Sequence, residues 1–240
     1  MVCEKVAAVV LAAGRGARME SNIHKQYMPL LGKPMIYYSL LAFQESRADE
    51  IILVTGAGEE EYCRKEIVEA YGFSKVTRIV TGGKERYHSV YEGLKAVADS
   101  DYVLIHDGAR PCITAEIIQA AIEEARESKA CVIGMPVKDT IKIADPLGFA
   151  AGTPDRNSLW LIQTPQAFSY SLILHAYRKL FEREENQQGI TDDAMVVEKM
   201  TDHKVKLVCG SYENMKVTTP EDMAVAEIFL SKRLKKGIDN

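Results

Sequence analysis

A glycine-rich segment with three nearby cations is the part of this sequence best suited to binding a phosphate chain. Residues 11–19 read LAAGRGARM and follow an apolar run. Small residues allow the backbone to close around phosphates with its N–H groups pointing inward. Arg15, Arg18 and Lys25 would add charged donors to the same anion. We predict a phosphate-binding loop here; a structural turn with solvated arginines is the alternative.

Two common nucleotide-binding motifs do not match this loop. The dinucleotide fingerprint needs Gly or Ala at its last position, which counted from Gly14 and Gly16 is Met19. A Walker P-loop needs Gly-Lys-Ser/Thr, which residues 11–19 lack. The surplus of cations and the missing fingerprint argue against a nicotinamide-dependent oxidoreductase.

A second glycine pair follows another apolar run, in residues 81–89, which read TGGKERYHS. The backbone at Gly82 and Gly83 could approach a base closely, and Ser89 could hydrogen-bond the base or a ribose. An ordinary strand-to-helix turn explains the pattern equally well.

Residues 106–111, HDGARP, end a third apolar run. A carboxylate that faces a polyanion needs a bridging cation, so Asp107 is the candidate ligand for Mg²⁺. Arg110 would face a second anion. The alternative is that Asp107 caps the following turn.

Five weaker candidates are polar or cationic residues next to expected turns and helix starts. Each position by itself is typical of capping and turn chemistry. They are Thr140, Arg156, Thr164, Thr191 and Lys216.

Composition limits the function classes. The 240 residues carry a formal net charge of −4, which argues against a general nucleic-acid binder. The five cysteines are odd in number and scattered, which favours reduced thiols and a cytoplasmic protein. The apolar run from Val6 to Ala13 is too short to span a bilayer and lacks the flanks of a signal peptide, so no membrane partner is expected.

Short runs rich in Val and Ile alternate with amphipathic stretches, which predicts an α/β fold with a mainly parallel sheet covered by helices. In such sheets ligands bind at the carboxyl ends of the strands, where the polar segments above fall. We expect strands at Lys5–Leu11, Glu50–Thr55, Lys75–Val80, Tyr102–His106, Cys131–Pro136 and Lys204–Val208. We expect helices at Met35–Ser46, Ala115–Glu127 (capped by Thr114) and Pro220–Lys235.

Residues 137–160 break this alternation and predict a β-arm that projects from a single domain spanning residues 1–240. A turn at Pro146–Gly148 lies inside it. Apolar residues without a covering helix suit a dimer contact, with a simple surface hairpin as the alternative.

Taken together and in this order, these segments resemble the 2-C-methyl-D-erythritol 4-phosphate cytidylyltransferase family from Leu11 to Asp222. The resemblance implies CTP and methylerythritol phosphate as substrates, Mg²⁺ or a similar divalent cation as cofactor, and a homodimer clasped by the β-arm. It also implies a Rossmann-like fold of the nucleotide-sugar-transferase type.

The resemblance assigns roles by motif. Ala12, Ala13, Gly14, Arg15 and Gly16 would wrap the CTP phosphates, and Gly83 and Ser89 would hold cytosine and ribose. Arg18 and Lys25 would stabilise the transition state, and Arg156 and Lys216 would position the sugar phosphate. The expected surroundings of methylerythritol phosphate are Asp107, Arg110, Thr140, Arg156, Thr164, Thr191 and Lys216.

One position departs from the pattern: Lys84 stands where some family members have an acidic residue, so a carboxylate contact to the nucleotide is not expected there. Ribitol-5-phosphate cytidylyltransferases share several motifs, but residues 107–111 (DGARP) and the arm ends resemble the methylerythritol type more closely. A non-catalytic nucleotide sensor on the same fold is the alternative from another class.

Overall fold

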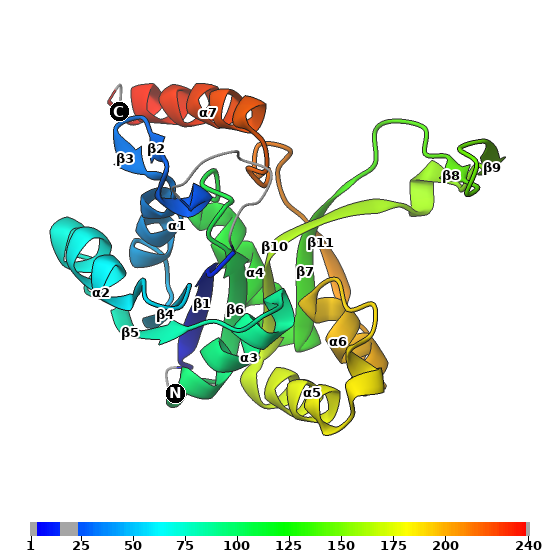
Figure 1. Cartoon of the computed structure of the whole chain (residues 1–240), viewed down its shortest axis with the longest axis horizontal. Helices are drawn as coiled ribbons and strands as arrows, with labels where there is room; N and C mark the ends of the chain where they lie inside the picture. Colours follow the sequence, from blue (N-terminus) through cyan, green and yellow to red (C-terminus); the bar gives the residue numbers. More distant parts are fainter. Residues whose placement is uncertain (1–3, 15–23, 239–240) are drawn as a thin grey trace.

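The computed structural model describes residues 4–14 and 24–238, which form a central sheet covered by helices on both faces (Figure 1). In this described part the main sheet has seven strands in the order β11-β7-β10-β6-β1-β4-β5. All neighbours pair in parallel except β10, which runs antiparallel to β6 and β7. The expected mainly parallel α/β sheet is confirmed.

The strands are β1 (Val6–Ala12), β2 (Pro29–Leu30), β3 (Lys33–Pro34), β4 (Glu50–Thr55), β5 (Val76–Thr81), β6 (Tyr102–Asp107), β7 (Ala130–Pro136), β8 (Ile143–Ala144), β9 (Ala150–Gly152), β10 (Trp160–Ser169) and β11 (Lys206–Cys209). The helices are α1 (Met35–Gln44), α2 (Glu60–Tyr62), continued by a π-helix (Cys63–Glu69), α3 (Arg86–Ala96), α4 (Ala115–Ser128), α5 (Tyr170–Glu182), α6 (Asp193–Met200) and α7 (Pro220–Ile238). Short 3₁₀ turns are η1 (Lys25–Tyr27), η3 (Arg156–Ser158) and η4 (Glu184–Gln187).

The two faces of the sheet bury alternate residues of the same strands, as strand geometry requires. On β1, Ala8 and Val10 join a core with α1 and α4, whereas Ala7 and Val9 join a core with α3, α5 and α6. Thr114 caps α4 as predicted, because its side chain accepts a hydrogen bond from the N–H of Ile117. These helices cover both faces of the sheet, and the carboxyl ends of its parallel strands lie together at one edge.

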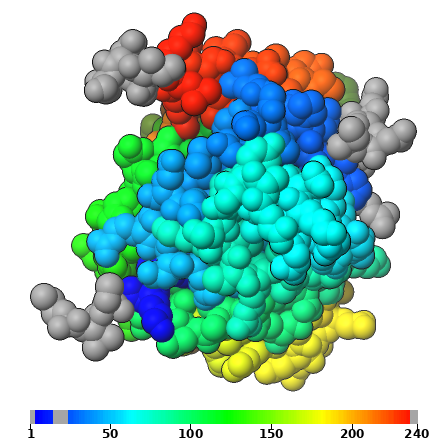
Figure 2. Space-filling model, turned by 90° about the vertical axis from the view of Figure 1, so that its left-hand side faces the viewer, coloured from blue at the N-terminus to red at the C-terminus, as the bar shows by residue number. Residues whose placement is uncertain are grey.

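Helix α7 packs on a third apolar cluster that includes Leu30 and Val217. Figure 2 shows the face turned away from the arm, with α7 along the top, the α2 segment in the middle and α5 at the bottom. The carboxylate of Asp222 accepts from the N–H groups of Thr218 and Thr219 at 2.7 and 2.9 Å, which fixes the chain just before α7. None of the helices in the described ranges is long and apolar enough to cross a membrane.

Strand β10 was not predicted. Apart from the arm, no strand is expected from the sequence between Pro136 and Lys204, yet Trp160–Ser169 form a ten-residue strand between β6 and β7. Its polar side chains mask the pattern: Gln163 and Gln166 are buried, and each is hydrogen-bonded to a neighbouring segment. The pairing of β10 with β7 shifts register between Ile162 and Gln166.

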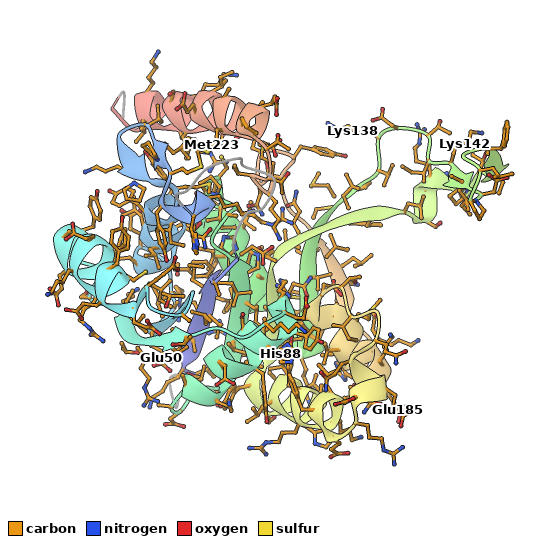
Figure 3. The ribbon with its side chains drawn as sticks, in the orientation of Figure 1. Glu50, His88, Lys138, Lys142, Glu185 and Met223 are labelled. Carbon is orange, nitrogen blue, oxygen red and sulfur yellow. The ribbon has the colours of Figure 1, made fainter. Side chains whose placement is uncertain are left out.

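Residues 137–160 form the expected projecting arm, whose tip is the β8–β9 hairpin far from the sheet (Figure 1). Lys138 and Lys142 mark its course from base to tip in Figure 3. The tip turn is held by Asp145, whose Oδ1 accepts from the N–H groups of Leu147 and Phe149 at 3.0 and 2.9 Å. Gly148 completes the turn with a φ of +86°, a conformation that favours glycine.

Candidate active site

A cleft of about 1010 Å³ opens at the carboxyl ends of β1, β4, β5 and β6. It brings together the predicted phosphate loop, the second glycine pair, the end of β6 and the segment before α7. Its described lining is Leu11, Ala13, Gly14, His24, Lys25, Gln26, Gly56, Ala57, Gly82, Gly83, Lys84, Glu85, Arg86, Ser89, Asp107, Ala109 and Lys216.

The first loop leaves β1 at the cleft, where Ala13 and Gly14 line the wall and Ala12 is buried. The buried amide of Gln26 donates to the carbonyl of Ala12 and, at 2.9 Å, to that of Gly14. Lys25 also lines the cleft, and its Nζ donates to the carbonyl of Val217 at 3.0 Å. Arg15, Gly16 and Arg18 lie outside the described residues.

The second glycine pair packs so tightly that larger residues would not fit. A Cβ on Gly82 would come within 2.5 Å of the Cβ of Ala13, and a Cβ on Gly83 within 2.3 Å of the Cβ of His88. The N–H of Gly83 donates to the Oγ of Ser89 at 3.1 Å. Glu85 and His88 form a capping box at the start of α3. The loop is therefore a fixed backbone surface at the wall of the cleft.

Asp107 ends β6 between two cations. Its Oδ1 accepts from the Nε of Arg86 at 3.0 Å, and its Oδ2 accepts from the Nζ of Lys216 at 2.8 Å. Burial alone would raise the pKa of this carboxyl group, but the charges of Arg86, Lys216 and Arg110 outweigh it and hold the pKa below its ordinary value. Asp107 is therefore an anion throughout the physiological pH range.

Arg86 and Asp193 are site residues that sequence reasoning missed. The two terminal nitrogens of Arg86 donate to the two oxygens of Asp193 at 3.0 and 2.9 Å, and Asp193 is fully buried. One signal was available: a cation in the first turn of a helix is unfavourably placed in the helix dipole, and an acidic partner would offset this. The partner lies 107 residues away, and no local pattern identifies it. Asp192, the neighbour of Asp193, is the residue that caps α6.

Two predicted substrate residues lie beside the cleft but are not among its described lining. Thr164 is buried, and its Oγ1 accepts from the N–H of Asp107 at 3.1 Å. Arg110 is buried and donates to the carbonyls of Asn214 and Ile162 at 2.9 and 3.5 Å. In this structure Thr164 supports Asp107, and Arg110 ties β6 to the segment before α7.

Three other predicted residues are exposed and outside the described lining of the cleft. Thr140 and Arg156 belong to the arm, and Arg156 donates to the carbonyl of Lys138 at 2.9 Å. Thr191 precedes α6, and its hydroxyl contacts the sulfur of Met195 at 3.9 Å. The structure thus gathers Lys25, Asp107 and Lys216 into one cleft and leaves the arm residues apart from it.

The fit of a divalent cation can be tested on Asp107. Within residues 4–14 and 24–238, no cluster of three or more His, Cys, Asp or Glu could hold a metal ion. Asp107 retains acceptor capacity, because each ionised carboxylate oxygen has two lone pairs and each here accepts from one cation. Mg²⁺ is commonly held by one or two carboxylates together with phosphates and water. Asp107 therefore fits as the protein ligand of a divalent cation that takes its other ligands from substrate phosphates and water.

Comparison with known proteins identifies matching sequences and folds. The family model described as IspD, 2-C-methyl-D-erythritol 4-phosphate cytidylyltransferase, matches residues 6–232. The chain is 52% identical over 229 residues to the 2-C-methyl-D-erythritol 4-phosphate cytidylyltransferase of Lachnoclostridium phytofermentans, covering 95% of this chain and 97% of that one. It is 55% identical over 224 residues to the protein of the same name from Lachnospira eligens, covering 93% and 98%.

A solved structure shows the same fold. The crystal structure of 4-diphosphocytidyl-2C-methyl-D-erythritol synthase from Anaerococcus prevotii superimposes with a TM-score of 0.82 at 36% identity, covering 95% of this chain and 96% of that one.

Proposed function

This chain belongs to the 2-C-methyl-D-erythritol 4-phosphate cytidylyltransferase family, and from that premise we propose that the cleft at the strand ends is its active site. The enzyme transfers CMP from CTP to 2-C-methyl-D-erythritol 4-phosphate, releasing pyrophosphate and giving 4-diphosphocytidyl-2-C-methyl-D-erythritol for isoprenoid precursor biosynthesis. The observation that carries the assignment is the convergence of Lys25, Asp107 and Lys216 with both glycine-rich loops on one cavity.

The nucleotide subsite is formed by the two loops. Ala12, Ala13, Gly14, Arg15 and Gly16 wrap the triphosphate, and Gly83 and Ser89 hold cytosine and ribose. Support comes from the backbone at Gly82 and Gly83, where the absence of Cβ atoms lets the chain pack closely on Ala13 and His88. The side chain of Lys84 lines the same wall, so this subsite is more cationic than in relatives with an acidic residue there.

The sugar-phosphate subsite lies on the Asp107 side of the cleft. Lys216 positions the phosphate, and Asp107, Arg110, Thr164 and Thr191 surround the polyol. Thr140 and Arg156 also belong to this subsite but sit on an arm that leaves their own cleft. We therefore assign these two residues to the active site of a partner subunit.

The chemistry follows from charge. A phosphate monoester oxygen must attack the α-phosphorus of CTP, and like charges about 4 Å apart repel by about 4 kcal/mol at an effective dielectric constant near 20. Lys25, Arg18 and Lys216 offset this repulsion and stabilise charge on the departing pyrophosphate. A monoester with a second pKa near 6 is already largely ionised, so the attack needs no general base. Catalysis consists of positioning and electrostatic stabilisation.

Mg²⁺ or a similar divalent cation is the proposed cofactor, held by Asp107 together with the substrate phosphates. When bound it would neutralise phosphate charge and act as a Lewis acid on the phosphoryl oxygens.

The proposed assembly is a homodimer made by the arm, with residues 1–240 as one domain and residues 137–160 as its insertion. At the arm tip the side chains of Leu147 and Phe149 are 82% and 70% exposed and two residues apart, and a cluster of exposed apolar side chains is typical of a protein contact. The cytoplasm is the proposed location, because Cys63, Cys112 and Cys131 are free and buried, as in a reducing compartment.

Pyrophosphate release from CTP and Mg²⁺ tests the proposal, with methylerythritol 4-phosphate compared with ribitol 5-phosphate. Fast release with methylerythritol 4-phosphate alone supports it. A preference for ribitol 5-phosphate would overturn the assigned substrate, and CTP binding without release in either mixture would favour a nucleotide sensor.

A further inference from the structure

The guanidinium of Arg86 links two carboxylates that belong to different parts of the chain. Its two terminal nitrogens bind Asp193 at the start of α6, and its Nε binds Asp107 at the end of β6. Planar, two-pronged pairing of this kind fixes the orientation of both partners, which a lysine cannot reproduce. The orientation of the Arg86 guanidinium group is therefore fixed.

Asp193 is held just as firmly from its other sides. The hydroxyl of Tyr177 donates to its Oδ1 at 2.6 Å, and its backbone N–H donates to Oε1 of Gln166 at 3.0 Å. Both Asp193 and Tyr177 are fully buried in the layer of α5 and α6. A buried carboxylate is tolerated only when paired, so Arg86 and Asp193 depend on each other.

The Arg86–Asp193 pair affects the cleft through the carboxylate of Asp107. Its Oδ1 is taken by Arg86, which leaves Oδ2 directed at the Nζ of Lys216. Lys216 is a flexible side chain, 38% exposed, and this is the ion pair that locates its charge. Without Arg86, Oδ1 of Asp107 would lose its hydrogen bond and the carboxylate could rotate, so that Oδ2 would no longer be held toward the Lys216 ammonium.

We infer that the Arg86–Asp193 pair is a positioning device for the transfer reaction: it orients the Asp107 carboxylate and, through it, holds the Lys216 ammonium where the sugar phosphate attacks. Arg86 and Asp193 are positioning residues in this role. The inference rests on the function proposed above for Lys216.

Asp193→Asn tests the device, because asparagine keeps the size of the side chain but removes the charge that anchors Arg86. We expect kcat to fall about ten- to a hundredfold, the range that a displacement of about 1 Å produces, with a raised KM for the sugar phosphate and an unchanged KM for CTP. Lys95→Ala is the control, because it also removes one charge, at an exposed position on the same helix as Arg86; its kcat should stay within about threefold of wild type.

A double-mutant cycle separates positioning from a purely structural role. If Arg86 and Asp193 act through Lys216, Asp193→Asn should change kcat much less in a Lys216→Ala background than in wild type. If the two substitutions lower kcat independently, so that their effects in the double variant are additive in free energy, the inference is overturned. Should Asp193→Asn fail to fold, the same cycle with Arg86→Lys, which keeps the charge but cannot bind both carboxylates, decides the question.

A readout independent of turnover is the acetylation rate of the Lys216 amine by limiting acetic anhydride, followed by mass spectrometry. Lys216 should react several times faster in folded Asp193→Asn protein than in wild type, whereas exposed Lys95 should react at an unchanged rate. Equal Lys216 rates in both proteins would overturn the inference. If wild type releases no pyrophosphate but the Lys216 rates still differ, the proposed function fails, and with it the role in transfer, whereas the control of Lys216 by the Arg86–Asp193 pair is still established.

Discussion

The Nζ of Lys216 lies 2.8 Å from Oδ2 of Asp107, although 109 residues separate the two along the chain. The backbone beside the lysine is fixed too, because the N–H of Val217 donates to the carbonyl of Ala109 at 2.8 Å. The carbonyl of the same Val217 accepts from Lys25. Segments from three distant parts of the chain therefore bring Lys25, Asp107 and Lys216 into one cleft.

Lys25→Ala and Lys216→Ala should each lower kcat by roughly two to three orders of magnitude, by analogy with the loss of one oxyanion donor. Each removes positive charge that offsets the repulsion between the substrates. The measurement is steady-state pyrophosphate release, with circular dichroism to establish folding. Lys95→Ala, at an exposed position on α3, is the control for loss of a lysine. Near-wild-type turnover of folded Lys25→Ala protein would refute the role assigned to Lys25.

The double substitution Leu147→Ser/Phe149→Ser should weaken the dimer and raise the KM for the sugar phosphate. It removes the exposed apolar tip but keeps Asp145, which holds the turn. Analytical ultracentrifugation measures the dimer, and deletion of residues 141–151 serves as the more drastic variant. A dimer of unchanged strength in both proteins would show that the arm is not the interface.

The sequence predicts the elements in which the local order of polar and apolar residues matches their burial in the structure. The expected strand at Glu50–Thr55 matches β4 at both ends, and the start of α4 is marked by its Thr114 cap. Three predicted loops meet at one cleft because parallel strands carry their carboxyl ends to the same edge.

The missed features depend on contacts between distant segments. Strand β10 contains Pro165 and two buried glutamines, so its residues do not alternate between polar and apolar. Its glutamines are tolerated inside because α6 and the segment before α7 satisfy them; Gln166, for instance, accepts from the N–H of Ala194 at 2.9 Å. The pairing of Arg86 with Asp193 likewise exists only once α3 and α6 lie on the same face of the sheet.

Gly83→Ala should raise the KM for CTP more than the KM for the sugar phosphate. The new Cβ would lie 2.3 Å from the Cβ of His88, so the loop must move away from the start of α3. That movement would also disturb the bond from the N–H of Gly83 to Ser89. Initial-rate kinetics with each substrate varied in turn provide the comparison, and equal changes in both constants would contradict a nucleotide-specific role for this loop.

His106 should make the folded state less stable as the pH falls from about 6.5. The side chain is fully buried beside Phe43, and burial lowers its pKa to about 3. An unfolded histidine has a pKa near 6.5, so below that pH the unfolded chain binds a proton that the folded chain does not.

The free energy of unfolding should therefore lose up to about 1.4 kcal/mol per pH unit from this one group. The pKa of Asp107 is depressed, so the stability that Asp107 contributes is retained above about pH 5 and is lost only in more acidic solution. Urea unfolding between pH 6.5 and 5 thus separates the effect of His106 from that of Asp107. His106→Asn should flatten the pH dependence in this window, whatever its effect on absolute stability, and His175→Asn at an exposed position controls for the substitution. An unchanged slope in the His106→Asn protein would mean that His106 takes up its proton while the protein is still folded.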